Sequence, residues 1–139
     1  YAHANVNYLR LDRIPRFEEG WDPVLKALRD GAFFLSTGEI LMPRFTIGGK
    51  QSGETLELGA SARTKLVVEL NWTFPMAFAE IVTGDGKEVY RQRIDLSETG
   101  AFGKKTLEKE LNLKGKSWVR FEAWDVAVNG VISQPLWLE

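Results

Sequence analysis

The chain has 139 residues, of which 44% are hydrophobic and 27% charged, so its size and composition are those of about one ordinary globular domain. Lys and Arg number 18 and Asp and Glu 19, for a formal net charge of -1 at pH 7 with no basic cluster, which argues against a nucleic-acid or membrane partner. One histidine and no cysteine exclude a disulfide, a cysteine nucleophile, an iron–sulfur site and a multi-histidine metal centre.

The N-terminal part is predicted to contain the only helix. Residues 1–20 alternate weakly in hydropathy and are interpreted as a short extended segment that leads into a turn. A helix of about ten residues follows, with Asp22 as its N-cap and Pro23 at the first helical position, where a missing N–H costs nothing. Gly31 is predicted to end the helix as a left-handed C-cap.

The predicted helix carries an apolar stripe formed by Trp21, Leu25 and Leu28. A helix this short is marginal on its own, so the stripe requires a surface to pack against. We expect it either to fold back onto the strand after Gly31 or to mediate self-association, because exposing it to water is unfavourable.

From Phe33 onward the hydropathy period changes to two. The clearest alternation lies in 64–72, and two hairpin turns are predicted, at 84–86 and at 129–130. The expected strands, in chain order, are 32–36, 39–47 with an interruption at Pro43, 55–58, 64–72, 77–83, 87–95, 105–113 as a charged edge strand, 117–128, and 131–138 with Pro135 at a strand end or edge.

This pattern predicts a mainly β fold: an antiparallel, immunoglobulin-like β-sandwich of about seven to eight strands, preceded by one short α-helix. We divide the chain into an N-terminal segment with the helix, 1–31, and a β-sandwich domain, 32–139.

One strand is the main candidate for a contact surface. Within 117–128, apolar residues face one way, while the other face carries two charged residues and two tryptophans. We interpret Arg120 and Glu122 as a local ion pair on the outer face or at a domain contact. The candidate interdomain or ligand contacts are Trp21, Leu25, Leu28, Arg120, Glu122 and Trp124.

The search for catalytic chemistry assigns no catalytic, cofactor-binding or metal-binding residue. A Ser-His-Asp arrangement would need His3, which is more simply a solvated terminal histidine than the trace of a metal site. Glu69 and Glu80 are interpreted as solvent-facing rather than as members of a carboxylate pair. Asp125 could bind Ca²⁺ through its oxygens, but no calcium-loop motif supports that reading.

The tryptophans leave two alternatives open. Flat aromatic rings on the face of a sandwich stack on sugars, which favours an independent carbohydrate- or ligand-binding module. Trp72, Trp118 and Trp124 lie in strands with apolar neighbours, which favours core or interdomain packing instead. Burial of these rings, against an exposed coplanar row, distinguishes the two.

The stretch from Trp21 to Glu39 resembles the end of the catalytic region in metallohydrolases of the polymerase and histidinol phosphatase (PHP) superfamily, in the carbaryl-hydrolase-like branch. Later stretches are similar to that family's C-terminal tail in the same order. These stretches are the glycine loop 48–53, Ala79-Glu80-Ile81-Val82 with Asp85-Gly86, Ser117–Trp124, and Ser133–Leu138.

The resemblance implies that this chain is the last helix of a catalytic barrel and an accessory β-sandwich behind it. The family's metal ligands, including an H-x-H pair, do not occur here. We therefore expect a non-catalytic piece without a cofactor, whose parent is a hydrolase or phosphoesterase using a divalent metal, zinc, manganese or iron. Its expected partner is the parent's catalytic domain in cis, with a homo-oligomer as an open alternative.

The chain begins at Tyr1 rather than at methionine, and we expect it to be part of a longer protein. A missing signal peptide therefore says nothing about export, and both cytoplasmic and periplasmic or secreted locations remain open.

Overall fold

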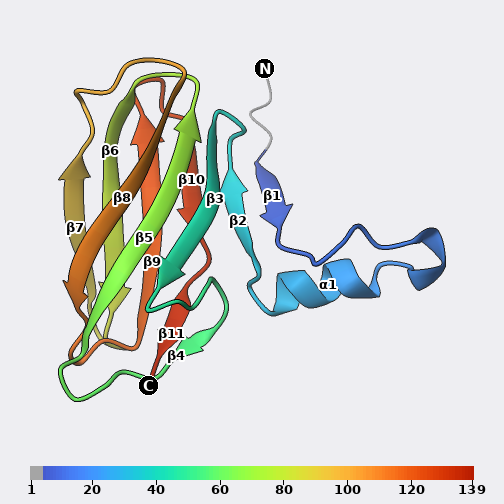
Figure 1. Cartoon of the computed structure of the whole chain (residues 1–139), viewed down its shortest axis with the longest axis horizontal. Coiled ribbons are helices and arrows are strands. Elements are labelled where there is room, and N and C mark those ends of the chain that lie inside the picture. The colour runs from blue at the N-terminus through green and yellow to red at the C-terminus, as the bar shows by residue number, and fades with distance from the viewer. Residues whose placement is uncertain (1–4) are drawn as a thin grey trace.

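The computed structural model describes residues 5–139, in which two β-sheets pack face to face and one α-helix, α1 (Asp22–Arg29), projects beside them (Figure 1). The smaller sheet contains β3 (Ile40–Ile47), β5 (Arg63–Trp72) and β8 (Gly103–Asn112). The larger sheet contains β1 (Val6–Leu9), β2 (Phe33–Ser36), β4 (Thr55–Leu56), β6 (Met76–Gly84), β7 (Val89–Asp95), β9 (Trp118–Asp125), β10 (Gly130–Ser133) and β11 (Leu136–Leu138).

The predicted mainly β, antiparallel sandwich with one short α-helix is confirmed. Every strand pair is antiparallel except β4 with β11, which run parallel. The described residues form eleven strands rather than seven to eight. The expected extended segment before the helix joins the sheet as β1, and the last expected strand is divided in two at Pro135.

Strand β9 lies in the middle of the larger sheet. One of its edges pairs with β6, and the other pairs first with β11 and then with β10. Because the ladder is interrupted between β10 and β11, the N–H of Phe121 has no backbone partner there and donates instead to Oγ of Ser133, at 2.9 Å. The hydroxyl of Ser133, which is buried, therefore satisfies a backbone N–H that the sheet leaves without a partner.

The core fills the space between the two sheets. In β5 the predicted alternation is confirmed, because Leu66, Val68, Leu70 and Trp72 are all buried. Across the core, β9 contributes Val119, Phe121 and Ala123, none of which has any exposed area. Both sheets therefore follow the period-two pattern that sequence alone indicates.

The strands at the edges of the smaller sheet behave as their sequences suggest. β8 pairs only with β5, so its charged outer residues blunt an edge as predicted. β3 runs through Pro43, and the interruption predicted there is a register shift between Leu41 and Arg44, which marks a β-bulge. The bulge accommodates a residue that has no N–H to donate.

The two predicted hairpins are present, but their turns differ in construction. Between β6 and β7, Asp85 Oδ1 accepts hydrogen bonds from the backbone N–H groups of Lys87 and Glu88, at 2.9 and 2.8 Å. Between β9 and β10, the left-handed residue is Val128, with a φ of 66°, and not the predicted Asn129-Gly130 pair. Gly130 is already the first residue of β10.

Gly130 belongs to a repeated arrangement in which a tryptophan covers a glycine on the neighbouring strand. In each case the two residues are direct cross-strand partners, and a Cβ on the glycine would overlap the indole ring. The pairs are Trp72 with Gly103, Trp118 with Gly84, and Trp124 with Gly130. These three tryptophans are thus built into the sheets.

Helix α1 begins one residue earlier than predicted. Trp21 rather than Asp22 occupies the N-cap position, and no side chain caps the first turn. The end matches the prediction: Gly31 has a φ of 69°, and the N–H of Ala32 donates to the carbonyl of Ala27 at 2.9 Å, which forms a Schellman motif. Gly53 lies so close to the helix end that a Cβ there would overlap the Asp30 carbonyl.

Candidate functional site

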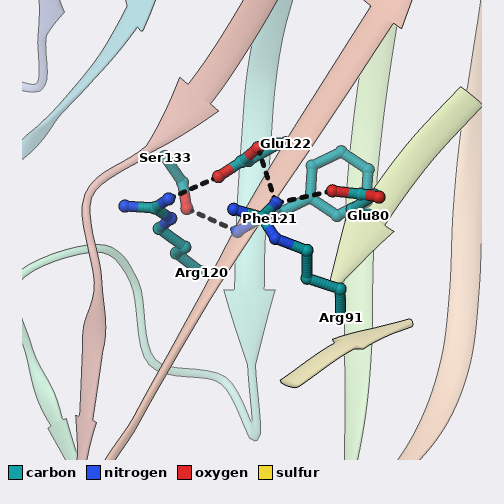
Figure 2. Close-up of polar contacts among 6 residues, drawn as sticks. All are labelled: Glu80, Arg91, Arg120, Phe121, Glu122 and Ser133. Carbon is teal, nitrogen blue, oxygen red and sulfur yellow. Dashed lines mark hydrogen bonds and ion pairs between the residues drawn. The ribbon is translucent and has the colours of Figure 1, made fainter. Parts of the chain in front are cut away.

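Four alternating charges meet on the outer face of the larger sheet, and we call Glu80, Arg91, Arg120 and Glu122 the outer-face charge cluster (Figure 2). The Glu122 carboxylate accepts from Arg120 Nη2 at 2.5 Å and from Arg91 Nη1 at 3.4 Å. The same Arg91 nitrogen donates to Glu80 Oε2 at 2.6 Å. The predicted Arg120–Glu122 pair is present, with Glu122 buried.

The strand register explains why the charges gather. Glu80 and Glu122 are direct cross-strand partners on β6 and β9, where two like charges would repel each other. Arg91 reaches both carboxylates from β7, and the hydrogen bond with Glu80 and the charge of Glu122 raise its pKa. Val82 is the cross-strand partner of Arg91 on β7 and of Arg120 on β9. It lies on the outer face and is nevertheless fully buried, as expected where the aliphatic parts of arginine side chains cover the sheet.

The cluster's geometry favours structure over acid–base chemistry. Both carboxylates are engaged by guanidinium groups, so neither has the environment of a general acid. The expectation that Glu80 faces solvent is wrong, since only 16% of its side chain is exposed. One donor is left over: Arg120 Nε is buried and has no hydrogen-bond partner in the described part of the chain.

Trp124 shares the outer face of β9 with the cluster and is half-buried against Gly130. Trp72 is buried in the core, where its Nε1 donates to the carbonyl of Gly100 at 2.8 Å. Because Trp118 is also covered on one side by a glycine, the three tryptophans do not form a free aromatic row. Packing is the role that their surroundings support.

The helix belongs to a second region, the arm, which comprises residues 10–31 and extends away from the sandwich (Figure 1). Trp21 is 74% exposed and Leu25 46% exposed, one helical turn apart on the same face. Ile14, in the preceding loop, is 90% exposed, and Phe17, the first residue of the short 3₁₀-helix η1 (Phe17–Glu19), is 97% exposed. The expectation that the stripe folds back onto the following strand is therefore wrong for Trp21 and Leu25.

Ala27, on the side of the helix away from Leu25, is buried, and it is the helix residue that attaches most closely to the rest of the chain. Leu28 belongs to the same stripe as Trp21 and is half-buried, so the stripe is covered only at its C-terminal end. The loop before the helix is held by Glu19, which accepts from the Arg13 guanidinium and from the Arg16 N–H. Those bonds, that of Arg13 first, lower the pKa of Glu19 to about 2.

Within residues 5–139, no group of three or more His, Cys, Asp or Glu side chains is placed to hold a metal ion. His3 lies outside the described residues. Asp125, considered for Ca²⁺, is buried and accepts three hydrogen bonds: from the N–H groups of Ala127 and Asn129 and from the Asn129 side chain, at 2.8 to 2.9 Å. Its oxygens thus hold the β9–β10 turn.

The structure brings together only some of the predicted contact residues. Arg120, Glu122 and Trp124 share one face of β9, whereas Trp21, Leu25 and Leu28 lie on the arm. The sequence reasoning missed Arg91, although the predicted Asp-Gly hairpin already placed its strand beside that of Glu80; in the register Arg91 is opposite Val82, two residues along from Glu80. It also missed Ile14 and Phe17, for which the irregular loop offers no periodic signal.

Neither the family models, nor the curated proteins, nor the solved structures that we compared with this chain give a match. In the part of the chain that the structure describes, no helix has the length and apolar character needed to span a membrane.

Proposed function

We propose that this chain is the non-catalytic C-terminal accessory β-sandwich of a metal-dependent hydrolase of the PHP superfamily, and that the arm binds the catalytic domain of the same protein. The observation that carries the proposal is the exposure of Ile14, Phe17, Trp21 and Leu25 on the arm. Large apolar side chains gathered at one projecting region are typical of a protein–protein contact.

The resemblance supports the choice of partner, because the stretch from Trp21 to Glu39 is similar to the family's passage from the last barrel helix into the tail. A barrel packed on the arm would cover Trp21 and Leu25 in the way that the apolar face of an amphipathic helix requires. The divalent metal of the parent, zinc, manganese or iron, would be held entirely by residues of the barrel.

The alternative of a carbohydrate-binding module has weaker support. Sugar stacking uses flat rings that are open on one side and grouped at one site. Trp72 is buried, and Trp118 and Trp124 lie six residues apart on β9, separated on the same face by Arg120 and Glu122, so the rings are not grouped at one site. The arm holds three of the most exposed large apolar side chains of the described residues, Ile14, Phe17 and Trp21.

The test uses the natural full-length protein with the double substitution Trp21→Ser and Leu25→Ser. We expect association between the two domains to weaken by about 2 kcal/mol or more, since buried tryptophans dominate such contacts. Differential scanning calorimetry would then show the sandwich unfolding separately from the barrel, and hydrolase activity would fall.

The matched control is Trp137→Ser, which removes a tryptophan that is 48% exposed on β11, outside the arm. It should leave domain association unchanged. The proposal is overturned if no metal-binding barrel precedes Tyr1 in the natural protein. It is equally overturned if the double variant and the control behave alike.

A further inference from the structure

A cleft of about 380 Å³ opens where the edges of the two sheets meet, between β1 and β2 of the larger sheet and β3 of the smaller. The residues that line it are mostly apolar, and its volume falls within the range of small-molecule sites. The lining residues are Tyr8, Leu9, Arg10, Phe33, Phe34, Leu41, Met42, Pro43, Phe45, Gln51 and Ser52.

Aromatic rings give one wall of the cleft a fixed shape. The rings of Tyr8 and Phe34 stack with their centroids 4.8 Å apart and their planes 8° from parallel. On β3, the β-bulge at Pro43 shifts the register with β5. The β3 residues that line the cleft are therefore not regularly paired with β5 at this point. Met42 and Phe45 line the cleft on the β3 side. Both are buried members of the hydrophobic core, so this side of the cleft is continuous with the core.

One charged group lines the cleft, and its position is determined by hydrogen bonds. Arg10 Nη1 donates to Gln51 Oε1 at 2.7 Å, and Nη2 donates to the carbonyl of Ser52 at 3.3 Å. The Arg10 backbone N–H donates to the carbonyl of Ala32 at 2.8 Å, which continues the pairing of β1 with β2. The guanidinium is therefore held on the rim by both main chain and side chain.

Arg10 forms no ion pair within the described part of the chain, although Asp12, Glu19 and Asp30 share with it the lining of the adjoining cleft. Among the ion pairs formed by residues 5–139, none includes Arg10, and no carboxylate belongs to the cleft lining. Two of the five guanidinium donors are engaged by neutral acceptors, so donors remain for a further partner. Arg13, three residues further along the chain, is instead paired with Glu19.

We infer that this cleft binds an amphipathic anion, a small molecule with a carboxylate on an apolar body, with the carboxylate at Arg10 and the body against Tyr8 and Phe34. A preorganised guanidinium favours carboxylates because it offers paired donors with little loss of side-chain entropy. The cleft uses Arg10, the first residue of the arm, but none of the exposed apolar residues that carry the proposed function, so the inference does not rest on that function.

The test is titration of the 139-residue chain with decanoate and with decanol, which share the apolar body but differ in charge. Backbone amide shifts of Phe34 and Met42 report binding in the cleft, whereas shifts confined to Trp21 and Leu25 report adsorption to the arm. We expect decanoate to bind in the cleft at least about tenfold more tightly than decanol, the advantage of a charged hydrogen bond.

Three variants sharpen the result. Arg10→Gln should lower decanoate affinity about tenfold and leave decanol affinity unchanged. Arg10→Lys should recover only part of that loss, because lysine keeps the charge but lacks the paired planar donors. Leu41→Trp, which fills the cleft, should abolish binding of both probes. Arg63→Gln, an exposed arginine of the smaller sheet, is the control and should change nothing. The inference is overturned if decanoate does not bind, if it shifts only the backbone amide signals of Trp21 and Leu25, or if the Arg10→Gln variant binds it with unchanged affinity.

Discussion

Tryptophan occurs in both the sandwich and the arm, and the two regions treat it differently. Trp72, Trp118 and Trp124 each lie against a glycine of a neighbouring strand, so their rings complete the surface of a sheet. Trp21 is 74% exposed on a helix that projects from the fold. Three of the four sandwich tryptophans therefore pack against neighbouring strands and Trp137 on β11 is 48% exposed, whereas the single tryptophan of the arm is the most exposed of the five.

The largest effect should come from the centre of the sandwich. Phe121 has no exposed area, and its N–H is held by Ser133. Phe121→Ala leaves a cavity and should lower the free energy of unfolding by about 3–5 kcal/mol in urea denaturation. Phe17→Ala, at an arm residue that is almost fully exposed, should change it by no more than about 0.5 kcal/mol. Equal effects would contradict the division into two regions.

The next effect concerns the tryptophan–glycine pairs. Gly84→Ala places a methyl group in the Trp118 ring, which must move, and we expect a loss of about 1–3 kcal/mol. Gly59→Ala is the matched control, because a Cβ there meets nothing within 4 Å and its φ is not positive. Thermal unfolding of the two variants compares them directly, and a neutral Gly84→Ala would show that the ring does not depend on the glycine.

The outer-face charge cluster should give a smaller effect. Glu122→Gln removes a buried carboxylate charge between two arginines that are partly solvated, and we expect a loss of about 1–2 kcal/mol. Glu108→Gln breaks the exposed pair with Lys65 and should cost no more than about 0.5 kcal/mol. Chemical denaturation would count against the cluster's structural role if both variants lost equally little.

The smallest effect is a dependence on pH at the β6–β7 turn. Hydrogen bonds from the Glu88 and Lys87 N–H groups, and then from the Tyr90 hydroxyl, lower the pKa of Asp85 from 3.8 to about 2. A lowered folded-state pKa means that this stabilisation is fully present above the unfolded value and is lost as pH falls from about 4 through about 2. Carboxyl NMR titration should show the Asp85 midpoint near the lower value, and an ordinary midpoint would refute it.

Much of the sandwich could be predicted because its signals are local. Alternating residues in β5 and β9 face the core as period-two patterning requires, and Gly31 ends the helix as a left-handed residue. The β9–β10 turn shows the limit, since Val128 rather than Asn129-Gly130 takes the left-handed conformation. Gly130 is instead in β10, beneath a tryptophan ring, a role that depends on the neighbouring strand.

The candidate sites were harder to predict because their residues come from strands and loops that are far apart in the sequence. The pairing of Arg120 with Glu122 follows from two residues on one strand, but Arg91 joins them through the register of three strands. The cleft at Arg10 combines β1, β2, β3 and the loop at Gln51 and Ser52, which no single stretch of sequence brings together. Features set by one stretch of sequence could thus be predicted, whereas those that depend on the register between distant strands required the structure.

The most direct test of the contrast between the two regions is the fluorescence of Trp21, obtained as the emission of the wild-type chain minus that of Trp21→Phe. In this chain alone, the difference spectrum should be that of a water-exposed indole, readily quenched by iodide. In the longer protein that we propose, with its catalytic domain on the arm, the difference spectrum should shift to the blue and lose its iodide sensitivity. A Trp21 that is shielded in the isolated chain, or equally quenched in both, would contradict the account.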